Sequence, residues 1–356
     1  MTPPKRRGRP RPAGRVAGPP LEIEGLRSVG GLVQFPATLR HLGADPEGVL
    51  RCAGLRANAL DDPGASISYA QVGALFGCAE LATGLAHIGL LSGAGWRLDH
   101  LGIVGQLVRN SDTFGDAMQS VVLHHWLNGA GAAPFMFRAD SLVEIGYALY
   151  ATGVPHGDHV YDAALAAWIT MIRQLLGPGW APSQVFLPRS RPANTAPYQR
   201  LFGVPVTFNS DYAALRFPSA QLAAPIAGAD PGRLATLGRA LTAIGPEPIA
   251  PRSHRLVRIM LARGDTTAES LAATLSLSRR TLDRRLKAQD LSFQAVLDGV
   301  RYEAARQLLE ISSVDIGSIA RALGYTEPSP FTRAFKRWSG QTPSAWRRSR
   351  RQPRRA

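Results

Sequence analysis

The chain has 356 residues and a formal net charge of +15, from 41 Lys and Arg against 26 Asp and Glu. This length allows two or three domains, each large enough to bury a core. Its two cysteines are too few for a disulfide framework or a cysteine-based zinc site, and no apolar run of about 18 residues predicts a membrane span. The first 20 residues lack the apolar centre of a signal peptide, so we expect a soluble cytoplasmic protein.

The positive charge is concentrated at the two ends of the chain. Residues 1–15 hold six Lys and Arg and no acidic residue (+6), and residues 252–356 hold 21 against 9 (+12). The 236 residues between them hold 14 against 17 (−3). Because basic ends on a near-neutral body attract polyanions, we expect nucleic acid as the partner, ahead of an anionic membrane.

Residues 1–20 are expected to form a disordered basic tail, because they are rich in Pro, Gly and Arg and contain almost nothing to bury. Their segment "KRRGRPRP" is similar to an AT-hook, whose arginines enter the narrow minor groove of A·T-rich DNA. Two alternatives to an AT-hook stay open for this segment: a nonspecific electrostatic arm, and an inert or misassigned N-terminus.

Residues 21–244 are expected to form an α+β domain. Apolar residues three and four apart predict helices within residues 36–55, 68–84, 113–126 and 158–177, and Ser68 is the expected N-cap of the second. The segments "APFMFRAD" and "VEIGYALY" have the pattern of paired strands. Three shorter strands are expected in "QVFLPRS", "PVTFNS" and "ALRFPS".

A linker is expected at residues 245–252, where prolines are frequent, and an all-α domain at residues 253–350. Thr266 and Glu269 have the spacing of a capping box at the start of one helix. Three further helices have suitable N-cap residues, which are Ser278, Ser292 and Asp315.

This all-α domain contains an internal repeat. "LAATLSLSRRTLDRRLK" at 271–287 matches "IARALGYTEPSPFTRAFK" at 319–336, with Leu282 and Leu286 in the places of Phe331 and Phe335. These apolar residues are expected to anchor the second helix of each unit while its cations project outward. The repeat therefore predicts two helix-turn-helix units joined by a long helix, each presenting a recognition helix to the DNA major groove.

The segment "IARALGYTEPSPFTRAFKRWSGQTP" closely resembles the second half of the DNA-binding domain of the AraC/XylS family of bacterial transcription regulators. Residues 30–240 are similar to the α+β effector-binding and dimerisation domain of one branch of that family. The resemblance implies a homodimer that responds to a small-molecule effector, with RNA polymerase as a further candidate partner. Ser276 and Asp290 stand where the family usually has Gly, which costs up to about 1 kcal/mol each if the backbone there is left-handed.

The outer faces of the two recognition helices supply the candidate contacts to double-stranded DNA. These are Arg279, Arg280, Asp283, Arg284, Lys287, Ser329, Thr332, Arg333, Lys336 and Arg337. Arg280, Arg284 and Arg333 are the leading candidates, the alternative being that some of them touch only phosphate or solvent.

Two kinds of side chain in this set are expected to act differently from the leading arginines. Asp283 can accept a hydrogen bond from a cytosine amino group or pair with a neighbouring Arg. Lys287, Lys336 and Arg337 are expected at the DNA backbone. An architectural protein dominated by nonspecific basic contacts is the alternative function.

Two histidine-containing segments raise the question of a metal site: His124-His125, and the group His156, Asp158 and His159. Both lie at or near ends of expected helices, and neither has a third potential ligand at a spacing typical of metal sites. We therefore interpret them as polar helix termini. No nucleophile elbow, phosphate loop or dinucleotide fingerprint is present in the sequence. We therefore expect no enzyme, no cofactor and no metal, and the sequence leaves the effector unknown.

Overall fold

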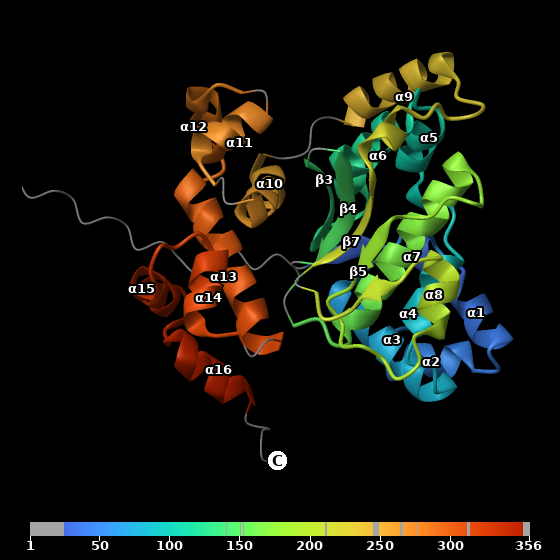
Figure 1. Cartoon of the computed structure of the whole chain (residues 1–356), viewed down its shortest axis with the longest axis horizontal. Coiled ribbons are helices and arrows are strands. Elements are labelled where there is room, and N and C mark those ends of the chain that lie inside the picture. The colour runs from blue at the N-terminus through green and yellow to red at the C-terminus, as the bar shows by residue number, and fades with distance from the viewer. Residues whose placement is uncertain are drawn as a thin grey trace, which may run out of the picture. The chain divides into compact units, whose positions relative to one another are not determined.

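The computed structural model describes residues 25–351, apart from positions 140, 150, 152, 211, 245–248, 264–265, 276 and 312–313. The chain divides into two compact units, Ile23–Arg255 and a C-terminal unit that begins at Leu256 (Figure 1). The basic tail and its AT-hook-like segment lie outside the described residues.

The N-terminal unit contains a five-stranded sheet. Its strands, in spatial order, are β3 (Ala132–Ala139), β4 (Leu142–Leu149), β7 (Ala213–Pro218), β5 (Gln184–Phe186) and β6 (Val206–Thr207). The expected hairpin of β3 and β4 is confirmed, with Phe135 opposite Gly146. All neighbouring strands are antiparallel except β5 and β6, which are parallel. A further two-stranded sheet, which was not predicted, pairs β1 (Leu26–Ser28) with β2 (Ser66–Ser68).

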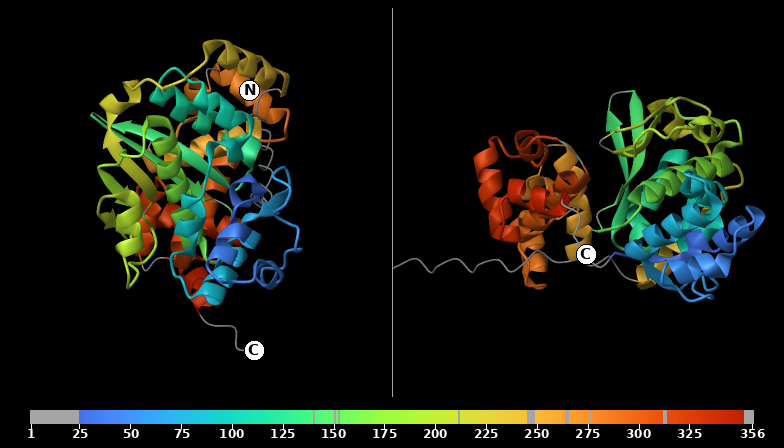
Figure 2. Two further views of the ribbon diagram at one scale, coloured as in Figure 1. Left: turned by 90° about the vertical axis from the view of Figure 1, so that its right-hand side faces the viewer. Right: turned by 90° about the horizontal axis from the view of Figure 1, so that it is seen from below.

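The helices of this unit pack mainly on one face of the sheet (Figures 1 and 2). The α-helices of the unit are α1 (Phe35–His41), α2 (Pro46–Cys52), α3 (Tyr69–Thr83), α4 (Ile88–Ala94), α5 (Ile103–Arg109), α6 (Phe114–His124), α7 (Gly157–Leu176), α8 (Ala196–Phe202) and α9 (Pro231–Ile244). Short 3-10 helices are η1 (Val29–Leu32), η2 (Leu98–Leu101), η3 (His125–Asn128) and η4 (Ser219–Ala223). Ser68 caps α3 as expected, in a capping box with Gln71. Within the described residues no single helix is long and apolar enough to cross a membrane; α3 and α4 reach that length only as a pair bent by 109°.

Helix α7 runs between the sheet and the helices of the first hundred residues (Figures 1 and 2). Ile169 on one of its faces is fully buried in the same core cluster as Val143 and Leu215 of the sheet. On α4, a Cβ added to Gly89 would lie 2.3 Å from the His159 carbonyl oxygen, and one added to Gly93 would lie 2.2 Å from that of Ala163. Glycine is therefore required at both positions, because α4 crosses α7 with backbone against backbone.

The two cysteines, expected to be too few for a disulfide framework, form a single disulfide. It joins Cys52 at the end of α2 to Cys78 in α3, with the two Cα atoms 6.0 Å apart. The sequence spacing of 26 residues did not reveal this pairing. The bond fixes α2 against α3 beside a second core cluster, which includes Val49, Leu75 and Phe76 and which Cys78 contacts.

The C-terminal unit confirms two helix-turn-helix units joined by a long helix. Its helices are α10 (Ile249–Arg263), α11 (Ala268–Thr274), α12 (Arg279–Lys287), α13 (Phe293–Ile311), α14 (Ile316–Ala322), α15 (Pro328–Ser339) and α16 (Pro343–Arg351). Helices α11 and α12 form the first helix-turn-helix, α14 and α15 form the second, and α13 connects them. The fold is thus an α+β unit followed by an all-α unit, as expected.

Two local expectations about this region were wrong. The linker expected at 245–252 overlaps α10, which begins at Ile249. Pro251 lies in its first turn, where proline is tolerated because the backbone N–H there has no helical partner. The cap of α11 is Thr267 rather than Thr266, since Thr267 accepts the Ser270 N–H and the buried Ala268 fixes the helix start.

The apolar anchors of the two recognition helices are confirmed. Leu282 and Leu286 of α12 and Phe331 and Phe335 of α15 all have no exposed surface. The Phe335 ring lies 5.7 Å from that of Tyr302 in α13, which ties α15 to the connecting helix.

Replacing either glycine of the α4–α7 crossing with alanine should destabilise the protein. We expect Gly89→Ala and Gly93→Ala each to lower the free energy of unfolding by about 1–3 kcal/mol, because the added methyl group forces the two backbones apart. Gly238→Ala in α9 is the matched control: it meets nothing within 4 Å, and a helical Gly→Ala change there should add about 0.5–1 kcal/mol. Denaturant titration followed by circular dichroism measures all three, and unchanged stability of Gly93→Ala would contradict the close crossing.

Removal of a recognition-helix anchor should also destabilise the protein. Phe335→Ala should cost about 3–5 kcal/mol of unfolding free energy, because it leaves a cavity under α15. Lys336→Ala, the adjacent exposed position, should stay within about 0.5 kcal/mol of wild type. Thermal melting compares the two variants, and similar melting curves would show that Phe335 does not hold the helix.

Candidate nucleic-acid interface and effector cavity

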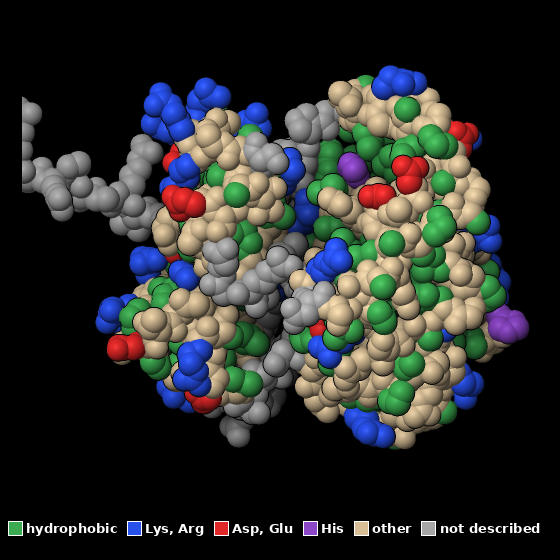
Figure 3. Space-filling view, turned by 45° about the horizontal axis from the view of Figure 1, so that its top comes forward, with side chains coloured by type: hydrophobic (Ala, Val, Ile, Leu, Met, Phe, Trp, Pro, Cys, Tyr) green, Lys and Arg blue, Asp and Glu red, His purple; other side chains and the backbone are tan. Residues whose placement is uncertain are grey.

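The two recognition helices present their cations away from the buried anchors. Helix α12 starts at the expected N-cap Ser278, whose hydroxyl accepts the Thr281 N–H. Helix α15 starts with Pro328 and ends at Gly340, which has a φ of +77°. On the surface of the C-terminal unit, Lys and Arg side chains stand out over these helices (Figure 3).

Asp290 occupies the turn after α12 that corresponds to Gly340 after α15. Its φ is +55°, so this position does require the left-handed backbone that a glycine adopts without cost. Ser276, the other departure from glycine, lies outside the described residues. The turn after α12 therefore carries strain that the turn after α15 lacks.

Five of the ten candidate DNA contacts are exposed cations that are free to meet a ligand. No ion pair or hydrogen bond within the described part of the chain engages the side chains of Arg280, Arg284, Lys287, Arg333 and Lys336. Ser329 is also exposed, and Thr332 is half-buried. These side chains share the outer faces of α12 and α15.

The other three candidates, Arg279, Asp283 and Arg337, take part in ion pairs within the same unit. Arg279 Nε lies 2.9 Å from Asp283 Oδ2, and its Nη1 lies 2.8 Å from Glu269 Oε1. Arg337 Nη2 lies 2.8 Å from Oδ2 of Asp298. Asp283 thus pairs with a neighbouring Arg, one of the two roles expected for it. These pairs engage only part of each guanidinium, so a phosphate would share the remaining N–H groups with a carboxylate.

A cavity opens in the N-terminal unit between α7, the strand β1 and the segment from α4 to η2. Its volume is about 840 Å³ with the open space at its mouth included. The aromatic residues of its wall are Tyr69, Trp96, Tyr147 and Trp168, and the α7 side of the wall adds Ala163 and Ala167. Ligand cavities of proteins are mostly apolar, with a few polar groups that orient the ligand. The lining of this cavity is therefore of a character that suits a small organic molecule.

The charge of this cavity is positive. Arg27 of β1 lines it, and none of the described residues in its wall is Asp or Glu. Burial and the nearby Arg27 guanidinium lower the pKa of His125 to about 3, so this histidine is neutral. Partial burial and Arg97 also lower the pKa of His100.

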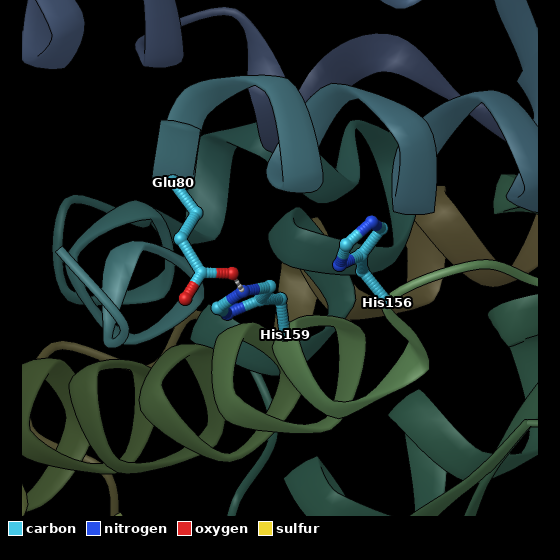
Figure 4. A group of neighbouring side chains, drawn as sticks. All are labelled: Glu80, His156 and His159. Carbon is cyan, nitrogen blue, oxygen red and sulfur yellow. Dashed lines mark hydrogen bonds and ion pairs between the residues drawn. The ribbon is translucent and has the colours of Figure 1, made fainter. Parts of the chain in front are cut away.

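The histidine segments lie in different surroundings. His124 Nδ1 lies 2.9 Å from the Ser120 carbonyl oxygen, as at an ordinary helix end, whereas His125 lines the cavity. Near the start of α7, His156 and His159 approach Glu80 of α3 (Figure 4), a third partner that the sequence did not reveal.

This Glu80–His156–His159 cluster is held by a hydrogen bond. His159 Nε2 lies 3.0 Å from Glu80 Oε2, and one potential ligand atom of each residue lies within 4.8 Å of the others. Ligands of a tetrahedral zinc ion, at about 2.0–2.2 Å from the metal, lie roughly 3.3 Å from one another. A metal would therefore require the three side chains to close further, and the hydrogen bond already accounts for the pairing of Glu80 with His159.

Comparison with known proteins agrees with both units. A family model described as the arabinose-binding domain of AraC transcription regulator, N-terminal, matches residues 43–226, and a helix-turn-helix domain model matches residues 271–349. The ornithine utilization regulator of Pseudomonas aeruginosa is 28% identical over 312 residues, which are 86% of this chain and 91% of the relative. The transcriptional regulator VirS of Mycobacterium tuberculosis is 27% identical over 333 residues, 92% and 98% of the two chains.

Among solved structures, the transcriptional regulator CdpR of Pseudomonas aeruginosa is 26% identical, with a TM-score of 0.38 over 73% of this chain and 86% of that one. The N-terminal family model alone spans more than half of the chain, and the helix-turn-helix model follows it in the order of the two units. The protein belongs to the AraC family of transcription regulators and is a DNA-binding transcription factor that responds to a small molecule.

Proposed function

We propose that α12 and α15 read two successive major-groove segments of one DNA site. The observation that carries this proposal is the set of five unpaired, exposed cations on the two helices. Arg284 and Arg333 occupy equivalent places, each two residues after a fully buried anchor and so turned by about 200° from it around the helix. Two helices that face the same side of the duplex would contact segments about 10 base pairs apart.

The contacts divide by chemistry. Arg280, Arg284 and Arg333 suit base edges, because a guanidinium can donate two hydrogen bonds to guanine. Lys287 and Lys336 suit phosphates, as point charges on flexible stems. Ser329 and Thr332, in the first turns of α15, suit hydrogen bonds to a phosphate of the DNA backbone or to a base edge.

The three residues in internal ion pairs have a supporting role in this proposal. Asp283 and Glu269 hold Arg279, which connects α11 to the start of α12. Arg337 joins α15 to Asp298 of α13. These pairs orient the recognition helices, and Arg337 has N–H groups outside its pair with Asp298 that suit the DNA backbone.

The remaining assignments concern domains, partners and place of action. We assign effector binding and dimerisation to residues 21–244 and DNA binding to residues 253–350, so that a homodimer presents two copies of the double helix-turn-helix. RNA polymerase is a candidate partner of the bound dimer. The protein would act in the bacterial cytoplasm, on the nucleoid, because its DNA site is there. The relatives are transcription regulators, and we propose no catalytic activity for this chain.

The cavity of the N-terminal unit is the place that we propose for the effector. The names of the family model and of one relative raise arabinose and ornithine as candidates for this chain. Ornithine carries two ammonium groups, which require acidic partners, and no described residue of the cavity wall is acidic. Arabinose needs many hydrogen-bond partners, whereas aromatic and alanine side chains make up much of the wall.

Single replacements in the recognition helices should change sequence preference. Arg284→Ala and Arg333→Ala should each cost about 1–3 kcal/mol of binding free energy at the cognate site and relax preference in one segment only. Binding to a library of randomised duplexes measures both quantities.

Arg285→Ala is the matched control for this experiment, since Arg285 is an exposed neighbour turned about 100° from Arg284. It should lower affinity evenly over all sequences. If both Arg284→Ala and Arg333→Ala keep the wild-type preference in a folded protein, the proposed reading by α12 and α15 is wrong. A specificity ratio near one for the wild-type protein would instead favour the architectural alternative.

The homodimer can be tested on the full chain. Analytical ultracentrifugation at tens of micromolar should give the mass of a dimer, because two copies of the DNA-binding unit are what a regulator of this family needs at a paired site. A strict monomer over that range would contradict the assignment of dimerisation to residues 21–244.

A further inference from the structure

We propose that the cavity of the N-terminal unit binds an organic carboxylate with a flat apolar body, and that Arg27 holds its carboxylate group. The inference rests on the proposed function, because it takes the cavity as the place where the effector acts. It adds the chemical class of the effector and the residue that recognises its charge. Three features of the cavity support this proposal: an unpaired cation, donors without acceptors, and aromatic walls.

Arg27 is the unpaired cation. Its side chain is half-buried in the cavity wall, and no ion pair or hydrogen bond from the described residues engages it. Its guanidinium carbon lies 5.9 Å from the centre of the Tyr69 ring, an aromatic face that attracts a cation without neutralising it. A partly buried guanidinium of this sort favours a ligand with a carboxylate, which accepts two parallel hydrogen bonds from it.

A second donor points to the same place as Arg27. A Cβ added to Gly31 would lie 2.7 Å from Arg27 Nη2 and 3.2 Å from Trp96 Nε1, so both N–H-bearing atoms approach one point above this glycine. The indole N–H of Trp96 has no hydrogen-bond acceptor among the described residues. Two donors that converge without an acceptor match the two oxygens of a carboxylate.

The rest of the polar wall agrees with an anion. Asn128 Nδ2 is buried and has no hydrogen-bond partner in the described chain. His125 is neutral and cannot supply a charge of its own. Since the described wall contains donors and one fixed cation but no carboxylate, an ammonium group would find no counter-ion there.

The side chains that line the cavity indicate the shape of the uncharged part of the ligand. The hydroxyl groups of Tyr69 and Tyr147 lie 2.5 Å apart, so one of them donates to the other, and both residues present ring surface to the cavity. On the α7 side, Ala163 and Ala167 leave room beside the Trp168 ring. Rings on several sides with small residues between them suit a flat apolar group better than a branched or highly hydroxylated one.

The test is isothermal titration of the full chain with a panel of small molecules. Phenylacetate and indole-3-acetate represent aromatic carboxylates, and their amides are the same size without the charge. Octanoate, arabinose and ornithine represent a flexible carboxylate, a polyol and a cationic amino acid. We expect at least one aromatic carboxylate to bind, with its amide roughly 10- to 100-fold weaker, the loss of hydrogen bonds to a charged group.

Variants then assign the charge to Arg27. Arg27→Gln should weaken the carboxylate roughly 10- to 100-fold and abolish its advantage over the amide. Trp96→Phe keeps an aromatic ring but removes the indole N–H, and it should weaken the carboxylate by about fivefold or more. Arg51→Gln, at an exposed arginine of α2 outside the cavity wall, should leave every affinity unchanged. Circular dichroism and thermal melting of each variant show that it is folded.

Several outcomes overturn the proposal. These are equal binding of carboxylate and amide, full carboxylate affinity in folded Arg27→Gln, preference for arabinose, ornithine or octanoate over the aromatic carboxylates, and no binding by any aromatic carboxylate. The sequence preference of the protein for DNA, measured without any small molecule, is independent of these results. Loss of the ligand class with intact DNA preference would therefore refute this inference and leave the proposed reading of DNA standing.

Discussion

The close contact between α4 and α7 is the constraint on which the N-terminal unit depends. Backbone meets backbone where Gly89 and Gly93 face the carbonyl groups of His159 and Ala163. That contact sets how far α7 stands from the first hundred residues, and α7 in turn packs against the sheet through residues such as Ile169. The cavity lies along the same helix, so its shape follows from the crossing rather than from any one wall residue. The α4–α7 crossing thus positions both the core helix α7 and the cavity that we propose for the effector.

In the C-terminal unit, buried apolar side chains hold the two highly charged helices α12 and α15 in place. Leu282 and Leu286 on α12, and Phe331 and Phe335 on α15, bury completely and fix which face points outward. The cations then separate into two groups. Arg279 and Arg337 neutralise carboxylates inside the unit, while Arg284 and Arg333 remain available. Burial of two apolar side chains on each helix therefore determines that its unpaired arginines lie on the opposite, solvent-exposed face.

Local features of this fold could be predicted from the sequence, and distant pairings could not. The β3–β4 hairpin, the cap at Ser68 and the paired anchors of the helix-turn-helix units depend on residues close in sequence or repeated along it. The place of β7 between β4 and β5, the approach of Glu80 to His159 and the cavity around Arg27 depend on segments far apart in the chain. For the candidate DNA contacts, sequence reasoning predicted the two helices and gave a pair of Asp283 with a neighbouring Arg as one possibility. It did not predict that Glu269 pairs with Arg279 or that Asp298 pairs with Arg337. The shift of one cap from Thr266 to Thr267 shows the limit even locally, since two adjacent threonines offer the same hydroxyl.

The left-handed backbone of Asp290 has a consequence for how much of the time each recognition helix is locally opened. A side chain at such a position costs up to about 1 kcal/mol relative to glycine, and a difference of that size corresponds to a roughly fivefold larger population of a locally opened form. Gly340, after α15, bears no such cost. In the proposed complex, the contacts of α12 would therefore be broken for a larger share of the time than those of α15. The two DNA segments would then be held for unequal fractions of the lifetime of one complex.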